Sequence, residues 1–208
     1  ILTAGPKREE QMDNVKRTIE NLGKAGIPIM GYNFSLAAVA GRKMLPYARG
    51  GAISPVYDKD ADENFDKPLP NGFVWGQQVE EAEGDMGDVS LEEMWDRYDW
   101  FMDRILPVAE AAGVKMAIHP DDPPYPIFGL PRIITCEKNL DRMLAIVDSP
   151  ANSLTLCTGS LGCAAFNDVT ALVRKYAARD RIAFMHIRNV QRFADGSFEE
   201  RAHFSPCG

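Results

Sequence analysis

The sequence has few of the features that mark membrane-spanning, disulfide-rich or nucleic-acid-binding proteins. Its apolar runs all fall well short of the roughly 18 residues that a membrane-spanning helix requires. It has only four cysteines in 208 residues, too few for a disulfide scaffold, which favours a reducing cytoplasmic location. Lys and Arg number 23 against 30 Asp and Glu, a net charge of −7, so we expect neither nucleic acid nor a membrane as a partner.

Signals that would divide or target the chain are also missing. No Ser/Gly linker or low-complexity run interrupts it, which predicts a single domain over residues 1–208. The start at Ile1 carries neither a Met nor a basic-then-apolar signal segment, so we expect a chain entered in the middle.

Helical and strand-like patterns alternate along the chain. Amphipathic periodicity predicts helices over residues 9–25, 90–113 and 140–147 and from Asn167 onward. Short apolar runs predict strands over residues 27–32, 114–118, 153–156 and 182–187. This order predicts an α/β fold with a parallel sheet covered by helices. Four strands correspond to half of a (β/α)₈ barrel, and an open doubly wound sheet is the alternative, although its glycine-rich fingerprint is missing.

Residues 41–89 fit neither element type. They are rich in Gly, Pro and acidic residues, including Asp58, Asp60, Asp62, Glu63 and Asp66. Long loops inside a compact domain are usually functional, so we predict a loop insertion near the mouth of an active site. A solvated acidic excursion is the alternative for its charged middle.

Three metal-ligating side chains stand at the ends of three successive predicted strands. His119 follows residues 114–118, Cys157 follows the next strand, and His186 ends the last one. The C-terminal edge of a parallel sheet is where α/β proteins build active sites. Imidazole and thiolate ligands suit Zn, Fe(II) or Mn(II), so the sequence predicts a metal site, with buried core residues as the alternative for each position.

Polar residues flank these three positions. Asp121 lies in a proline-rich turn after His119, and Ser160 lies in a glycine-hydroxyl turn after Cys157 that could hold an anionic or hydroxylated group. Arg188 and Asn189 follow His186, and an Arg there could clamp a substrate carboxylate. A plain turn and a surface salt bridge are the simpler alternatives.

Several segments together are similar to one enzyme family. They are Leu22-Gly23-Lys24-Ala25-Gly26-Ile27, Tyr32-Asn33-Phe34, Arg49-Gly50-Gly51-Ala52, His119-Pro120-Asp121-Asp122-Pro123-Pro124, Phe128-Gly129-Leu130-Pro131-Arg132-Ile133, Asp148-Ser149-Pro150-Ala151-Asn152, Leu156-Cys157-Thr158-Gly159-Ser160-Leu161-Gly162 and His186-Ile187-Arg188-Asn189-Val190. The chain thereby resembles the bacterial mannonate dehydratases. The resemblance implies a (β/α)₈ barrel of the xylose-isomerase-like type that binds Mn(II) or Fe(II) through His, Cys, His and a late Asp. The first three ligands carry over to His119, Cys157 and His186, whereas the late motif with the Asp falls beyond Gly208.

The resemblance also implies a reaction, the dehydration of D-mannonate to 2-keto-3-deoxy-D-gluconate in hexuronate catabolism. The residues expected to serve it are Arg188 and Asn189, which would orient the sugar acid, Asn33, Ser160 and His203 as substrate contacts, and Tyr32 or Asp121 as contributors to acid–base chemistry. We expect the main general acid and base to lie outside this chain, and we therefore expect weak turnover from these 208 residues alone. A sugar isomerase or epimerase and a non-catalytic metal-binding fragment are the alternatives, and a homodimer is compatible with each.

Overall fold

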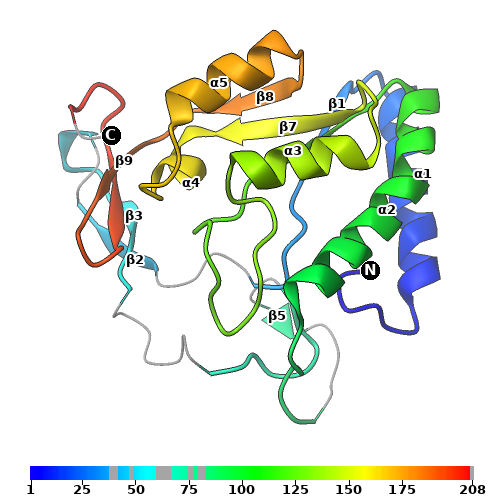
Figure 1. Ribbon diagram of the computed structural model, residues 1–208, viewed down its shortest axis with the longest axis horizontal. Helices are drawn as coiled ribbons and strands as arrows, with labels where there is room; N and C mark the ends of the chain where they lie inside the picture. The colour runs from blue at the N-terminus through cyan, green and yellow to red at the C-terminus, as the bar shows by residue number, and fades with distance from the viewer. Residues whose placement is uncertain (38–41, 47–48, 60–66, 75–76, 79–82, 207–208) are drawn as a thin grey trace.

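The computed structural model describes residues 1–37, 42–46, 49–59, 67–74, 77–78 and 83–206 (Figure 1). The helices are α1 (Arg8–Lys24), the 3-10 turn η1 (Arg49–Gly51), α2 (Leu91–Ala112), α3 (Glu137–Ile146), α4 (Thr158–Gly162) and α5 (Val169–Ala178). The strands are β1 (Ile29–Tyr32), β2 (Arg42–Leu45), β3 (Ser54–Tyr57), β4 (Phe73–Val74), β5 (Gln77–Gln78), β6 (Lys115–Ile118), β7 (Asn152–Cys157), β8 (Ile182–His186), β9 (Asn189–Arg192) and β10 (Phe198–Arg201). None of the helices in the described part of the chain has the length and apolar character needed to span a membrane.

A four-stranded parallel sheet with the order β1-β6-β7-β8 forms the centre of the fold. The chain returns to the sheet through a helix before β6, β7 and β8, as right-handed crossovers require. Helix α2 begins with the capping box of Ser90 and Glu93 and ends at Gly113, which adopts a left-handed conformation. The predicted α/β class is confirmed, and the sheet corresponds to four consecutive strands of a β/α barrel.

The two faces of this sheet differ in character. Met30, Met116, Leu154 and Leu156 belong to the hydrophobic core that the sheet shares with α1, α2, α3 and α5. The register pairs Gly31 with Ala117 and Ala117 with Ser153, so on β1, β6 and β7 the opposite face carries small and polar side chains at these positions. In a closed barrel that face points inward.

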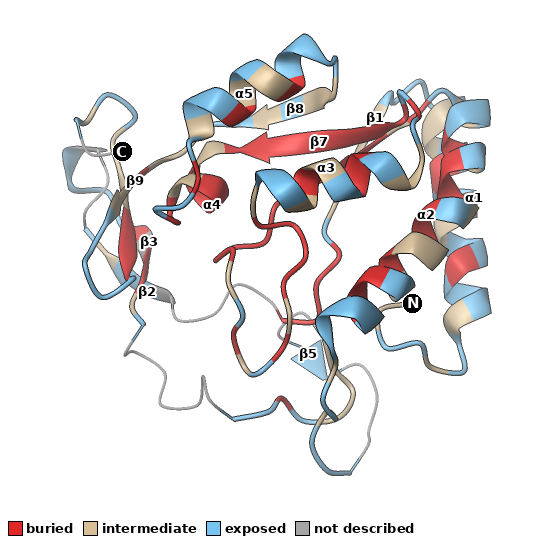
Figure 2. Cartoon of the chain, viewed as in Figure 1, coloured by how far each residue is buried: buried red, intermediate tan, exposed pale blue. Residues whose placement is uncertain are grey.

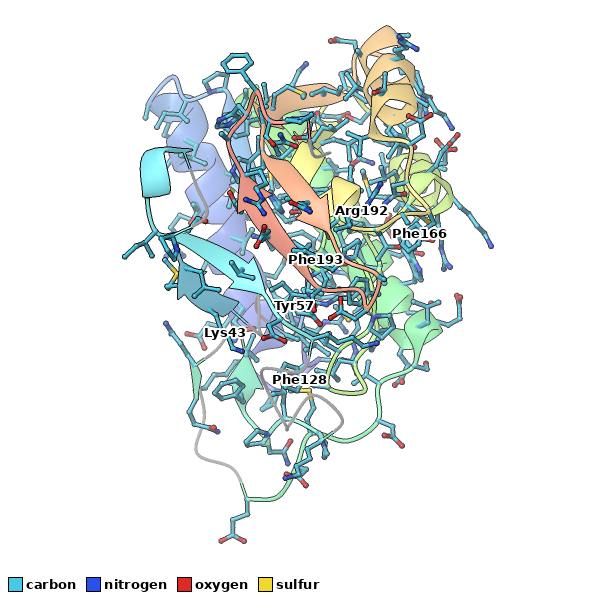
Figure 3. All side chains as sticks on the ribbon, turned by 90° about the vertical axis from the view of Figure 1, so that its left-hand side faces the viewer. Lys43, Tyr57, Phe128, Phe166, Arg192 and Phe193 are labelled. Atoms are coloured by element: carbon cyan, nitrogen blue, oxygen red, sulfur yellow. The ribbon has the colours of Figure 1, made fainter. Side chains whose placement is uncertain are left out.

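A second sheet, antiparallel and with the order β2-β3-β10-β9, lies at one side of the molecule and faces the viewer in Figure 3. Its inner surface is a small core of Tyr57, Cys163, Val190 and Phe198, in which the Tyr57 and Phe198 rings stack with centroids 5.1 Å apart. Strands β9 and β10 follow directly after β8, so this sheet adjoins the end of the parallel one.

The prediction of an uninterrupted loop over residues 41–89 was wrong, because β2, β3, β4 and β5 lie within it. These strands are two to four residues long, and β3 pairs with β10 some 140 residues later, so no local pattern shows them. Strands β9 and β10 were also missed. The acidic residues Asp60, Asp62, Glu63 and Asp66 lie outside the described residues.

The predicted start of the last helix at Asn167 was two residues early. Asp168 caps α5 by accepting a hydrogen bond from the Ala171 amide, so the helix begins at Val169. The Asn167 side chain instead donates to the carbonyl oxygens of Thr135 and Leu161 and ties neighbouring segments together.

Candidate metal centre

The ends of β6, β7 and β8 bring three potential metal ligands together. The register pairs Cys157 directly with His186, and His119 follows the last residue of β6. One ligand atom from each of His119, Cys157 and His186 lies within 4.8 Å of the others. Two bonds of about 2.0–2.3 Å that meet at a tetrahedral angle hold their ligand atoms roughly 3.3–3.8 Å apart, so these three side chains would draw slightly closer together to share one metal.

A backbone hydrogen bond fixes the orientation of His119. Its Nδ1 lies 2.7 Å from the Pro120 carbonyl oxygen, which can only accept, so Nδ1 is the donor. Nε2 then faces Nδ1 of His186 at 3.3 Å. Metal-binding histidines characteristically donate their second nitrogen to a carbonyl or carboxylate in this way.

The surroundings of Cys157 lower the pKa of its thiol. Burial opposes its ionisation, but hydrogen bonds from His119 and Ser160 outweigh burial and lower the pKa of Cys157 to about 7. Burial likewise disfavours the charged form of His119, but Cys157, the Pro120 carbonyl oxygen and Asp122 together outweigh burial and raise the pKa of His119. Burial, with the neighbouring His119 and Arg188, lowers the pKa of His186 and favours a neutral imidazole.

Arg188 does not point into solvent but joins a buried polar cluster. Its Nη1 lies 2.7 Å from Asp122 Oδ2, and its Nε lies 2.7 Å from Glu200 Oε1. Burial disfavours its charge, yet Asp122 and Glu200 raise the pKa of the guanidinium above its usual value. Ser160, which is fully buried, contacts both Asp122 and Cys157. Arg188 is therefore bound to carboxylates of the chain itself, in contrast to the expected clamp on a substrate carboxylate and to the surface salt bridge considered as its alternative.

The Asp121 carboxylate is bound by neighbouring groups of the chain, in contrast to the acid–base role expected for it. Its carboxylate accepts hydrogen bonds from the backbone N–H groups of Ile133 and Ile134 and from Arg132, at 2.9–3.2 Å. Burial raises the pKa of Asp121, and these partners oppose that rise. Arg132 also donates to Ser35 and to the Ala37 carbonyl oxygen, so the buried pair fastens the loop after β1 to the loop after β6.

The remaining predicted residues lie at different distances from the cluster. The Tyr32 hydroxyl turns toward α2 and shares a hydrogen bond of 2.8 Å with Tyr98, away from the ligands. Asn189 donates to the carbonyl oxygens of Ala202 and Ser205 and thereby holds the segment after β10. His203 donates to the carbonyl oxygen of Ile187, next to His186 in the chain. We therefore find no contact that supports a catalytic role for Tyr32 or Asn189.

A cavity of about 270 Å³ borders the candidate ligands. Asn33, His119, Pro120, His186 and Arg188 line it, with Ser35, Ala37, Asp121, Asp122 and Arg132. A larger cavity of about 710 Å³ lies between α1, β1 and residues 71–74 and 86–89, and it is mostly apolar. Among the described residues, the His119, Cys157 and His186 cluster borders the smaller cavity, so we take that cavity as the candidate site.

Sequence inspection missed three residues that shape this centre: Asp122, Glu200 and Arg132. Asp122 was visible in the turn after His119, but nothing local indicated that its carboxylate would meet an arginine 66 residues later. Glu200 lies on β10, a strand that was not predicted. Arg132 carried no signal beyond its place in a family-like segment.

The chain matches the family model described as D-mannonate dehydratase (UxuA) over residues 1–208. A mannonate dehydratase of Streptococcus equi subsp. zooepidemicus is 43% identical over 98% of this chain and 58% of its own length. One of Endomicrobium trichonymphae is 37% identical over 98% of this chain and 60% of its own. The chain thus spans about 60% of the relatives that it matches.

A solved structure gives the same result. The crystal structure of mannonate dehydratase from Streptococcus suis serotype 2 superposes with a TM-score of 0.83 at 38% identity, and the match covers 100% of this chain and 56% of that one. The family model, the relatives and the shared fold agree over essentially every residue. The chain therefore belongs to the D-mannonate dehydratase (UxuA) family.

Proposed function

We propose that the protein containing this chain dehydrates D-mannonate to 2-keto-3-deoxy-D-gluconate, with Mn(II) or Fe(II) as its cofactor. The observation that carries the proposal is the convergence of His119, Cys157 and His186 within 4.8 Å at the C-terminal edge of a parallel sheet. Family membership supplies the substrate, since the relatives are named mannonate dehydratases.

The donor set supports a divalent transition metal. Two imidazoles and one thiolate suit Fe(II) or Zn better than Mg or Ca, and Mn(II) is proposed from the family resemblance. The hydrogen bond from His119 to Pro120 holds one imidazole ready, and the low pKa of Cys157 makes its thiolate available near neutral pH. When bound, the metal supplies Lewis-acid stabilisation for the negative charge that develops when C2 of the sugar acid loses its proton.

The chain's own residues bind and orient the substrate. Asn33 is exposed and lines the cavity beside His119 and His186, where its amide can hydrogen-bond a sugar hydroxyl. Dehydration also needs a base for the C2 proton and an acid for the departing C3 hydroxyl. We assign neither task to Tyr32 or Asp121, because Tyr32 turns toward α2 and the Asp121 carboxylate holds two loops together.

The test is a steady-state assay of the whole purified protein with D-mannonate and added Mn(II), following formation of the 2-keto acid. We expect turnover that is lost on chelation and restored by Mn(II). We also expect His119→Ala to lose turnover by orders of magnitude.

The product identifies the alternatives. Conversion to an isomeric sugar acid without loss of water would show an isomerase or epimerase instead. Metal binding without turnover of the whole protein would show a metal-binding protein without this activity.

A further inference from the structure

The sulfur of Cys157 lies close to three hydrogen-bond donors that do not come from the histidines. The Ser160 hydroxyl oxygen lies 3.2 Å from Sγ, the Ser160 amide nitrogen 3.4 Å, and Arg188 Nη1 3.7 Å. All three are within hydrogen-bonding reach of sulfur, and the side chains that donate them are almost entirely buried. Two residues therefore determine where this sulfur can lie.

Ser160 occupies a defined place in the cluster. Arg188 Nη1 lies 3.2 Å from its hydroxyl oxygen and donates to it, so the hydroxyl proton points elsewhere. That single proton has two acceptors in reach, Cys157 Sγ at 3.2 Å and Asp122 Oδ2 at 3.1 Å. Ser160 thus connects the sulfur to the ion pair behind it.

The Arg188 side chain is already bound by two carboxylates of this chain. Asp122 binds its Nη1, while Glu200 accepts from both Nε and Nη2 at 2.7 Å. Its backbone is fastened too, because Arg188 N donates to Thr158 Oγ1 and that hydroxyl donates back to the Arg188 carbonyl oxygen. The side chain is only 10% exposed.

Gly159 makes room for this arrangement. A Cβ at position 159 would lie 2.6 Å from Arg188 Cβ, 2.9 Å from its Nε and 3.0 Å from its Cζ. The arginine side chain lies against the backbone of the turn after Cys157, at a distance that only glycine allows. The absence of a side chain at Gly159 therefore allows Arg188 to take this position.

We propose that Ser160 and Arg188, the latter clamped by Asp122 and Glu200, are positioning residues that hold the Cys157 sulfur toward His119 and His186. This inference rests on the metal site proposed above. Hydrogen bonds to a metal-bound thiolate orient it, so their loss should weaken metal binding. They also withdraw electron density from the sulfur, so their loss should make the sulfur a stronger electron donor. It replaces the expectation that Arg188 clamps the substrate carboxylate.

The experiment uses the whole protein loaded with Co(II), which reports thiolate ligation through a sulfur-to-cobalt charge-transfer band. Ser160→Ala removes the hydroxyl, and Gly159→Ala displaces Arg188 while removing no hydrogen-bonding group. We expect each to lower Co(II) affinity about 10–100-fold, in the range typical of residues that support a metal ligand. We also expect the band to move to lower energy, because the sulfur lone pairs are less stabilised.

Two further variants keep the test interpretable. Arg188→Met would leave Asp122 buried without its cation and could unfold the protein. Glu200→Gln is the gentler probe, because it weakens the binding of Arg188 but keeps an oxygen acceptor. It should give the same shift of the band to a smaller extent. Arg192→Gln is the matched control, since Arg192 is an exposed arginine on β9 (Figure 3). Its side chain donates to the Gly162 carbonyl oxygen and, among the described residues, makes no hydrogen bond with Cys157, Ser160 or Arg188. This variant should bind Co(II) as the unmodified protein does.

The outcomes separate the two proposals. The positioning role alone is overturned if the unmodified protein shows the sulfur-to-cobalt band and the folded variants Ser160→Ala and Gly159→Ala have the same Co(II) affinity and band energy. A higher KM for D-mannonate in Glu200→Gln with unchanged Co(II) binding would favour the substrate clamp instead. Absence of any sulfur-to-cobalt band in the unmodified protein overturns the metal site, and this inference with it.

Discussion

Strands β7 and β8 lie side by side and each carries a candidate ligand, but their surroundings differ. Strand β7 is paired on both sides, and all six of its residues are buried (Figure 2). Strand β8 is paired only with β7 among the described strands, and none of its residues is fully buried. Phe184, on the same face of the sheet as His186, is 54% exposed.

The difference extends to the ligands themselves. Cys157 is completely buried and receives hydrogen bonds from Ser160 and Arg188, so its position is determined by this chain. His186 is exposed at the edge and contacts the His119 ring. The Cys157 half of the centre is thus held by packing and hydrogen bonds, which we expect to make it the rigid side, whereas the His186 half lies on the edge strand of the described sheet.

The largest effect on stability is expected on the rigid side, at the buried pair of Arg132 and Asp121. Arg132→Met leaves the Asp121 carboxylate buried without its cation, and we expect a loss of about 3–5 kcal/mol in the free energy of unfolding. Urea denaturation measures it, with the exposed Arg192→Met as the control. Equal stability of the two variants would show that the loops after β1 and β6 are not held by this pair.

A direct comparison of the two strands uses one apolar residue from each. Leu156→Ala on β7 removes a side chain that is 1% exposed, and we expect a cost of about 2–5 kcal/mol. Phe184→Ala on β8 should cost about 0.5 kcal/mol, because its ring is largely in solvent. If Phe184→Ala matched Leu156→Ala in denaturation, β8 would be covered in the folded protein and the contrast would fail.

The smallest effect concerns the ionisation of Cys157. With its pKa lowered to about 7, the metal-free protein should gain a thiolate as the pH rises through 7, whereas an ordinary thiol ionises near about 8.5. Thiolate absorbance measured against Cys157→Ser isolates this step from the other cysteines. Because protons compete with the metal for the sulfur, metal affinity should also fall as the pH drops below 7.

A difference spectrum that titrates near 8.5 would mean that the donors around Cys157 do not stabilise its thiolate. The buried position would then dominate, since burial alone raises the pKa of a thiol.

Local patterns predicted the elements that place the ligands. The apolar runs before His119, Cys157 and His186 identify three strands, and the parallel arrangement alone then brings their C-terminal ends together. The helices could also be predicted from local patterns, because each has apolar residues at helical spacing along the face that it buries.

The rest of the centre depends on contacts between distant segments. Arg188 was assigned to a substrate because its two carboxylate partners come from distant segments, the turn at Asp122 and β10, and the Asp195-Gly196 turn of the β9–β10 hairpin was overlooked. Asp121 was considered as a catalyst because sequence cannot show that the loop at Ile133 returns to bind its carboxylate. Hydrogen bonds of this kind are fixed by tertiary structure, and only coordinates show which partner a polar side chain chooses.

The most direct measurement is anomalous diffraction from crystals of the whole protein soaked in Mn(II). We predict a single strong peak within coordination distance of His119 Nε2, Cys157 Sγ and a ring nitrogen of His186. Manganese bound elsewhere, with no peak between these three side chains, would contradict the assignment of the metal site.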